Sequence, residues 1–165
     1  MNQMYAEAGV KRKDDIKIMG LRALLVVGVV LGVLLLLLGG YFGMGGIVLI
    51  VALLWVYPKL NVDYEYVFVD GQIDFDKITG KSKRKTLLRI DMEQVEIVAP
   101  QGSHALDGYT NMQLVNKDFS SNDKSSKPYI IIASVKDRKY RISFEPSEKM
   151  LAMMKQKSPR KIAQY

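Results

Sequence analysis

The chain has 165 residues, of which 48% are hydrophobic, and it contains no cysteine. The absence of cysteine excludes disulfides, thiolate nucleophiles and cysteine-ligated zinc or iron–sulfur centres. The formal net charge is +7, but basic and acidic residues are interleaved. That interleaving favours a membrane surface over nucleic acid as the anionic partner, and we expect no nucleic-acid binding.

No charged residue occurs between Arg22 and Lys59. As one helix this interval would extend about 54 Å at ~1.5 Å per residue, far beyond the ~30 Å hydrocarbon core of a bilayer. The interval therefore predicts a two-span transmembrane hairpin over residues 16–58, with a glycine-rich turn near residues 39–46. Pro58 ends the second span because proline cannot continue a helix.

The charged residues that flank this hairpin lie next to its two open ends, opposite the turn. The segment 1–15 carries the cluster Lys11-Arg12-Lys13, and Lys59 follows the second span, whereas the turn has no charge. The positive-inside rule then predicts a multi-pass protein of the cell membrane with both termini in the cytoplasm. A cleaved signal peptide is the alternative, but the charged leader is long and a second span follows immediately.

Gly28 and Gly32 form a G-x-x-x-G pattern in the first span. This pattern lets another helix approach closely, and the partner is either the second span or another membrane protein. Glycines that are merely tolerated in an apolar helix explain the pattern equally well.

Alternating apolar and polar residues begin directly after Pro58 and predict a soluble domain over residues 59–157. Tyr64, Tyr66 and Phe68 point to one face of a strand, and Asp70-Gly71 is a strong hairpin-turn sequence. Seven strands are expected in all, the later six near residues 73–78, 85–90, 93–99, 112–116, 129–135 and 140–144.

A C-terminal amphipathic helix follows these strands. Pro146 suits its first turn, Met150 and Met154 lie on its apolar face, and Pro159 follows its end. We expect residues 158–165 to form a frayed basic tail.

An antiparallel sheet that is bent and capped by an amphipathic helix hides both its edges and its apolar face. We therefore predict a membrane α-helical hairpin followed by an α+β, mainly antiparallel domain. Its architecture would be a pleckstrin-homology (PH)-like barrel of about seven strands capped by the C-terminal helix.

Two stretches also carry a family resemblance, YVFVDGQI at residues 66–73 and LRIDMEQVEI at residues 88–97. Through them the chain resembles small membrane-anchored bacterial PH-like domain proteins, in which two spans precede the barrel. It is also similar to an uncharacterised group of short membrane proteins from Gram-positive anaerobes. The resemblance implies a fold and a topology, and it implies no activity.

Catalytic and metal-binding patterns are sparse. His104 is the one histidine of the chain, and a lone loop histidine cannot make a metal site. Asp74 and Asp76 should share a strand face, as an acid/base pair would, although a solvent face opposite Ile73 and Phe75 is the simpler interpretation. We expect no metal, no cofactor and no enzymatic activity, with an enzyme using Asp74 and Asp76 as an alternative.

The best binding candidate is a cluster of cations after the second strand: Lys81, Lys83, Arg84, Lys85 and Arg89. Near an anionic surface each cation contributes about 1 kcal/mol of attraction. Alternatively, the cluster keeps an exposed edge strand from pairing with another chain. A second basic set comprises Lys136, Arg138, Lys139 and Arg141.

These features together predict a non-enzymatic module that presents a PH-like domain at the cytoplasmic face of the lipid bilayer. Its expected partners are anionic lipid headgroups or an unknown membrane protein. The alternative is a small regulatory subunit of a larger membrane complex, assembled through Gly28 and Gly32.

Overall fold

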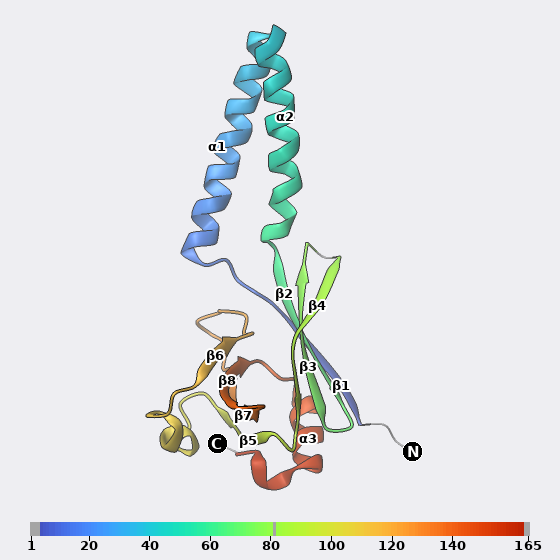
Figure 1. Cartoon of the computed structure of the whole chain (residues 1–165), viewed down its shortest axis with the longest axis vertical. Coiled ribbons are helices and arrows are strands. Elements are labelled where there is room, and N and C mark those ends of the chain that lie inside the picture. The colour runs from blue at the N-terminus through green and yellow to red at the C-terminus, as the bar shows by residue number, and fades with distance from the viewer. Residues whose placement is uncertain (1–3, 81, 164–165) are drawn as a thin grey trace.

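The computed structural model describes residues 4–80 and 82–163. Two antiparallel helices, α1 (Ile16–Leu38) and α2 (Gly40–Val56), form a stem that projects away from the rest of the chain (Figure 1). A short 3₁₀ turn, η1 (Tyr57–Leu60), connects α2 to the sheets. Both helices are long and apolar enough to cross a membrane. The reversal between them occurs at Gly39 and Gly40, whose φ angles of 69° and 54° lie in the left-handed region that favours glycine.

Within the described residues, eight strands form two four-stranded sheets. The first sheet has the order β1 (Tyr5–Lys11), β2 (Val62–Val69), β3 (Gln72–Thr79), β4 (Lys83–Asp91) and is antiparallel throughout. The second contains β5 (Val95–Pro100), β6 (Val115–Asp118), β7 (Tyr129–Val135) and β8 (Arg138–Phe144), in the order β5-β7-β8-β6. In it, β6 runs parallel to β8. The predicted single barrel of seven strands is therefore corrected to two separate sheets.

The strand missing from the sequence prediction is β1, which precedes the hairpin. Its sequence, YAEAGVK, is short of large apolar residues, so it lacks the alternation that marks a half-buried strand. Ala6 nevertheless is fully buried, and β1 pairs with β2 along its whole length, from Tyr5 opposite Val69 to Lys11 opposite Asp63. The hairpin is thus inserted between two neighbouring strands of one sheet, and does not simply precede the domain.

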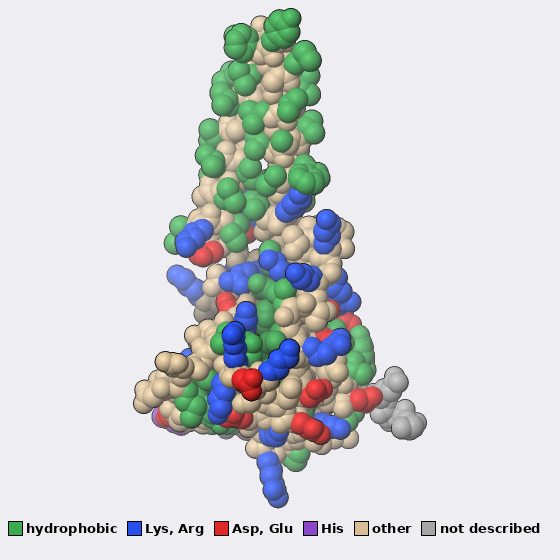
Figure 2. All heavy atoms as spheres, viewed as in Figure 1, with side chains coloured by type: hydrophobic (Ala, Val, Ile, Leu, Met, Phe, Trp, Pro, Cys, Tyr) green, Lys and Arg blue, Asp and Glu red, His purple; other side chains and the backbone are tan. Residues whose placement is uncertain are grey.

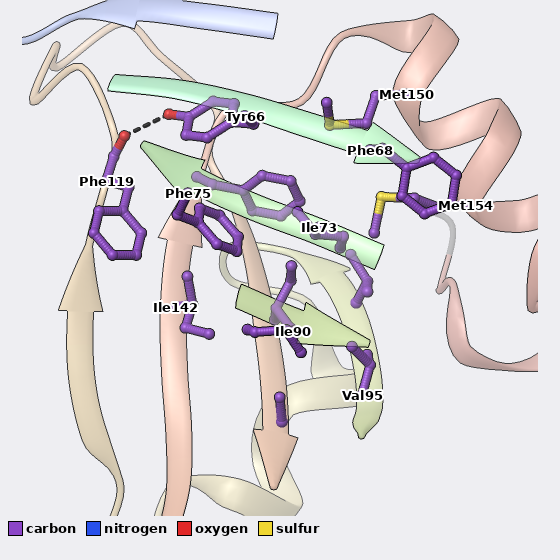
Figure 3. Close-up of a cluster of buried hydrophobic side chains, with 14 of the residues drawn as sticks. Tyr66, Phe68, Ile73, Phe75, Ile90, Val95, Phe119, Ile142, Met150 and Met154 are labelled. Carbon is purple, nitrogen blue, oxygen red and sulfur yellow. Dashed lines mark hydrogen bonds between the residues drawn. The ribbon is translucent and has the colours of Figure 1, made fainter. Parts of the chain in front are cut away.

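The apolar core lies between the two sheets and the C-terminal helix α3 (Glu148–Lys157) (Figure 3). Its largest fully buried side chains include Tyr66, Phe68, Ile73, Phe75, Phe144, Met150 and Met154. The rings of Tyr66 and Phe75 both meet Phe144 edge to face, with centroids 5.6 and 5.8 Å away. The predicted alternation in β2 and the predicted methionine face of α3 both supply this core.

The C-terminal segment is ordered against the second sheet, contrary to the predicted frayed tail. The Lys161 ammonium donates hydrogen bonds to the carbonyls of Met92 and Glu93, at 2.7 and 3.0 Å. The Ala163 N–H donates to the Val98 carbonyl at 2.8 Å. These bonds satisfy carbonyls of the β4–β5 turn and of β5, which explains why residues 158–163 pack. Residues 164–165 lie outside the described part of the chain.

Candidate functional site

The β3–β4 turn and the 119–128 loop meet the two ends of the hairpin where it joins the domain. We call this region the hairpin-side end. The β3–β4 turn reaches the foot of α2, because the Gly80 N–H donates to the Asn61 carbonyl at 3.1 Å. The 119–128 loop reaches the foot of α1, because the Lys13 N–H donates to the Ser121 carbonyl at 2.7 Å. Figure 2 shows Lys and Arg side chains gathered over this region, directly below the apolar stem.

Arg22 ties the two feet of the hairpin together. Its guanidinium donates to a carboxylate oxygen of Asp14 and to the side-chain oxygen of Asn61, both at 2.9 Å. It also lies over the Tyr57 ring, 5.7 Å from the centroid. The Arg22 Nε, by contrast, is buried and has no hydrogen-bond partner among the described residues.

A β-bulge in β4 determines which members of the predicted cationic cluster share a face. Phe75 pairs with Leu88 and Asp76 with Thr86, which leaves Leu87 as the extra residue. Arg84 and Arg89 are an odd number of positions apart and would point to opposite faces of a regular strand. The bulge brings both to the outer face of the first sheet, away from the core.

The two arginines of the cluster are occupied by ion pairs on that outer face. Arg89 binds Asp74 through two parallel hydrogen bonds of 2.7 Å, and these hold the pKa of Asp74 below its usual value. Arg84 binds Asp76 at 2.9 Å and also contacts Glu65.

Glu65 also interacts with the carboxyl group of Glu7 in β1. The hydrogen bond between the two raises the pKa of Glu65, whereas Arg84 lowers it. Arg84 and Arg89 therefore stabilise the sheet and are not free for a partner. Lys81 lies outside the described residues.

The lysines of the cluster belong to the other face. Lys83 and Lys85 are exposed, and neither forms an ion pair with any described residue. Lys85 also lies directly opposite Lys77 across the β3–β4 ladder. Like charges in such a position destabilise a sheet, so Lys77, Lys83 and Lys85 are a cationic group that the fold itself does not need. We call these three residues the β3–β4 lysines.

The second basic set lies elsewhere. The strand β7 starts after the 119–128 loop and runs antiparallel to β8, so the β7–β8 turn lies at the end of the second sheet away from that loop. Lys139 pairs with Glu96 at 2.8 Å and lowers the pKa of that carboxyl. This set therefore does not join the β3–β4 lysines.

The glycines of α1 face α2 of the same chain. A Cβ at Gly28 would lie 2.8 Å from Leu53, and one at Gly32 would lie 2.6 Å from Ile50. On α2, Gly46 is so close that its Cβ would meet the Gly32 carbonyl at 2.5 Å. The structure thus places both glycines of the predicted pattern inside the hairpin.

The remaining candidates are His104, Asp74 and Asp76. His104 is exposed and lies 3.1 Å from the Asp107 carboxylate. Within residues 4–80 and 82–163, no group of three or more His, Cys, Asp or Glu residues could hold a metal ion. Asp74 and Asp76 do share the outer face, and each is bound by an arginine. Asp76 is nevertheless buried, and its Oδ1 has no hydrogen-bond partner among the described residues.

A cavity of about 700 Å³ lies beside the 119–128 loop, and its lining is more polar than apolar. Its lining combines Asp118 and Asp123 with Lys124 and Lys127. Asp123 also binds the Lys13 ammonium at 2.6 Å, which lowers the pKa of Asp123 to about 2. The loop is thereby held against the segment that leads into α1.

Sequence reasoning missed Arg22, Lys77 and the 119–128 loop as parts of this region. Arg22 and Asn61 are far apart in the chain, and their contact depends on the insertion of the hairpin between β1 and β2. Lys77 is one isolated lysine in a strand, and only the β3–β4 register reveals its neighbour Lys85.

Comparison with known proteins agrees with this architecture. The model of a bacterial PH-like domain family (DUF6106) matches residues 2–164, and the chain belongs to this family. The match confirms the PH-like domain predicted from the sequence. No curated protein and no solved structure matches the chain.

Proposed function

We propose that this protein is a non-enzymatic membrane module in which the α1–α2 hairpin spans the bilayer and the PH-like domain faces the cytoplasm. There, the β3–β4 lysines bind anionic lipid headgroups. The observation that carries the proposal is the position of Lys77 directly opposite Lys85 in the β3–β4 ladder, because an anionic surface would offset the repulsion between these like charges.

The side chains of the stem support its place in a bilayer. Large apolar groups are exposed along both helices, among them Leu24, Val30 and Val48, which are 66%, 55% and 70% exposed. A contiguous apolar surface of this kind requires lipid or a partner to cover it. Lys59 lies over the Trp55 ring at the foot of α2, and Tyr41 and Phe42 lie at the tip, as interfacial aromatic belts require.

The connection of the hairpin to the sheet supports the proposed orientation. Because α1 follows β1 and α2 precedes β2, both feet start from paired strands. The described residues on either side of the hairpin therefore lie on one side of any membrane that it enters. The basic residues at the feet favour the cytoplasmic side.

Assembly as a subunit of a larger membrane complex is not favoured by the stem. The surface proposed for it, Gly28 and Gly32, is occupied by α2. A protein partner for the β3–β4 lysines is instead an outcome of the test below.

The test is lysine footprinting of the full chain in lipid nanodiscs, with an acetylating reagent and mass spectrometry. We expect Lys77, Lys83 and Lys85 to be modified several-fold more slowly in nanodiscs that contain phosphatidylglycerol than in phosphatidylcholine alone. Lys136, in the β7–β8 turn of the second sheet, is the internal control and should react equally in both. Equal rates for all four lysines would remove the lipid-headgroup role and leave a protein as the partner of this surface.

A further inference from the structure

The cavity of about 700 Å³ beside the 119–128 loop has no part in the proposed function, and we call it the loop cavity. The loop supplies most of its lining, and Gln101, Asp118 of β6 and Ser143 of β8 supply the rest. No lining residue belongs to β3 or β4, so the loop cavity is separate from the β3–β4 lysines. Small-molecule sites in proteins commonly enclose about 300–1,000 Å³, and the loop cavity falls within this range.

The acidic groups of the loop cavity are already bound by the protein. One carboxylate oxygen of Asp118 accepts from the N–H and the hydroxyl of Ser120, at 3.0 and 2.6 Å, and the other lies 3.5 Å from the Arg12 guanidinium. One oxygen of Asp123 accepts from a backbone N–H of the loop at 3.1 Å, and the other binds the Lys13 ammonium at 2.6 Å. Each of the four carboxylate oxygens thus has a donor, and neither carboxylate is free to bind a cationic ligand.

The basic groups of the lining are free. Lys124 and Lys127 are exposed, and neither ammonium forms an ion pair or a hydrogen bond within the part of the chain that the structure describes. The two lining carboxylates are balanced by their own cations, and Glu145, which binds Ser121 of the loop, offsets only part of the remaining charge. The groups that line or bind the loop are therefore net positive, which favours an anion in the loop cavity.

The loop that forms the cavity is held in place before any ligand binds. The Tyr66 hydroxyl donates to the Phe119 carbonyl at its start. The N–H and the hydroxyl of Ser121 donate to one oxygen of Glu145, at 2.8 and 2.7 Å. The Ser121 carbonyl in turn accepts from the Lys13 N–H. A loop that is anchored in this way loses little conformational freedom when a ligand binds, and this favours affinity.

We propose that the loop cavity binds a small, water-soluble phosphate monoester, with its phosphate group between the ammonium groups of Lys124 and Lys127. A phosphate monoester carries a charge of about −1.5 to −2 at neutral pH, which matches two free ammonium groups better than a singly charged carboxylate does. Among the described residues, the other lining side chains without a hydrogen bond are the amides of Gln101 and Asn122 and the hydroxyl of Ser143. These groups both donate and accept hydrogen bonds, so they suit an ester whose body carries hydroxyl groups.

The test is isothermal titration calorimetry of the full chain in nonionic detergent micelles, with glycerol 3-phosphate as the probe at constant ionic strength. We expect Lys124→Gln and Lys127→Gln each to raise the dissociation constant about tenfold, the effect of losing one hydrogen bond to a charged group. Lys149→Gln is the matched control, because it removes an exposed lysine of α3 that does not line the cavity. This control should bind the probe as the natural chain does.

Two further probes test the class of ligand. Glycerol lacks the phosphate and should not bind. Glycerophosphoglycerol, the singly charged headgroup of phosphatidylglycerol, should bind several-fold more weakly than glycerol 3-phosphate. Equal or tighter binding of glycerophosphoglycerol would assign the loop cavity to a lipid headgroup and overturn the soluble monoester as its ligand.

No binding of glycerol 3-phosphate at millimolar concentration, or unchanged dissociation constants in both cavity variants, would also overturn the proposal. Substitutions of exposed residues seldom change stability by much, and thermal unfolding in micelles checks that both variants remain folded. Weaker binding in Lys85→Gln alone would place the probe at the β3–β4 lysines and reject the loop cavity. The inference does not rest on the proposed function, because the probes are water-soluble and the cavity variants leave the β3–β4 lysines intact.

Discussion

At the scale of single residues, Tyr66 connects the core to the hairpin-side end. Its ring packs between Phe75 and Phe144, with centroids 5.7 and 5.6 Å away. Its hydroxyl donates to the Phe119 carbonyl at the start of the 119–128 loop (Figure 3). Burial raises the pKa of this hydroxyl, so it stays a neutral donor. The loop that carries Asp123 is therefore held from the inside by Tyr66.

Tyr66→Phe should lower the free energy of unfolding by about 1–3 kcal/mol, because the buried Phe119 carbonyl loses its donor. Urea unfolding of the full chain in micelles, followed by circular dichroism, measures the change. Tyr140→Phe, at a partly exposed ring in β8, is the control and should change stability by less than about 0.5 kcal/mol. Equal effects of the two substitutions would show that the Tyr66 hydroxyl contributes nothing specific.

The Lys13–Asp123 pair gives a pH dependence of known sign. The pKa of Asp123 is lowered from 3.8 to about 2 in the folded chain. A lowered carboxyl pKa stabilises the fold above the unfolded value, and that stabilisation disappears as pH falls through the folded value. We therefore expect the contribution of Asp123 to be complete above pH ~4 and to vanish between pH ~4 and ~2.

Thermal unfolding midpoints of the natural chain and of Asp123→Asn, measured from pH 6 to pH 2, test this expectation. The two midpoints should converge as the pH approaches 2. A difference that stays constant over the whole range would contradict an ionic origin for the contact.

At the scale of elements, the hairpin is held together by close backbone approach. Gly46 of α2 lies against Gly32 of α1, and Gly45, its chain neighbour, has nothing within 4 Å of its Cβ position. Without a hydrophobic driving force between helices in a bilayer, such small-residue contacts are a main source of attraction. Gly45 and Gly46 are therefore a matched pair for substitution, because only Gly46 is packed against α1.

Gly46→Ala should separate the helices and destabilise the hairpin by about 1–3 kcal/mol, the usual cost of forcing an extra carbon into a packed site. Gly45→Ala places the same methyl group in open space and should leave stability unchanged or slightly higher. Thermal unfolding in micelles, followed by helical circular dichroism, compares the two. If both alanines behave alike, the α1–α2 packing described here is wrong.

The elements also show what sequence reasoning can and cannot find. The hairpin, the alternating strand β2 and the helix α3 each have a strong local pattern, and each was predicted close to its observed bounds. The strand β1 has no such pattern, because two of its three inward positions, Ala6, Ala8 and Val10, are small alanines. That Arg89 shares a face with Arg84, and not with Lys83 and Lys85, depends on the bulge at Leu87, and a bulge has no reliable signal in a single sequence.

At the scale of the whole molecule, the hairpin and the domain form one unit. The stem is joined to the first sheet through both β1 and β2, and Arg22 closes the gap between its feet. A fragment that begins after the hairpin would lack β1, exposing the edge of β2 and the surface that β1 gives to α3. For this reason the experiments above use the full chain. The two attachments also fix the hairpin-side end, with its β3–β4 lysines, at the base of the apolar stem.

The central claim is that the hairpin crosses the membrane and leaves the domain in the cytoplasm. The chain contains no cysteine, so single cysteines can report its topology without any background. Met44→Cys, at the exposed tip of the hairpin, and Ser125→Cys, in the exposed 119–128 loop, are labelled in intact bacterial cells with a membrane-impermeant maleimide. We predict labelling of Met44→Cys in intact cells and of Ser125→Cys only after lysis; labelling of Ser125→Cys in intact cells would contradict the account.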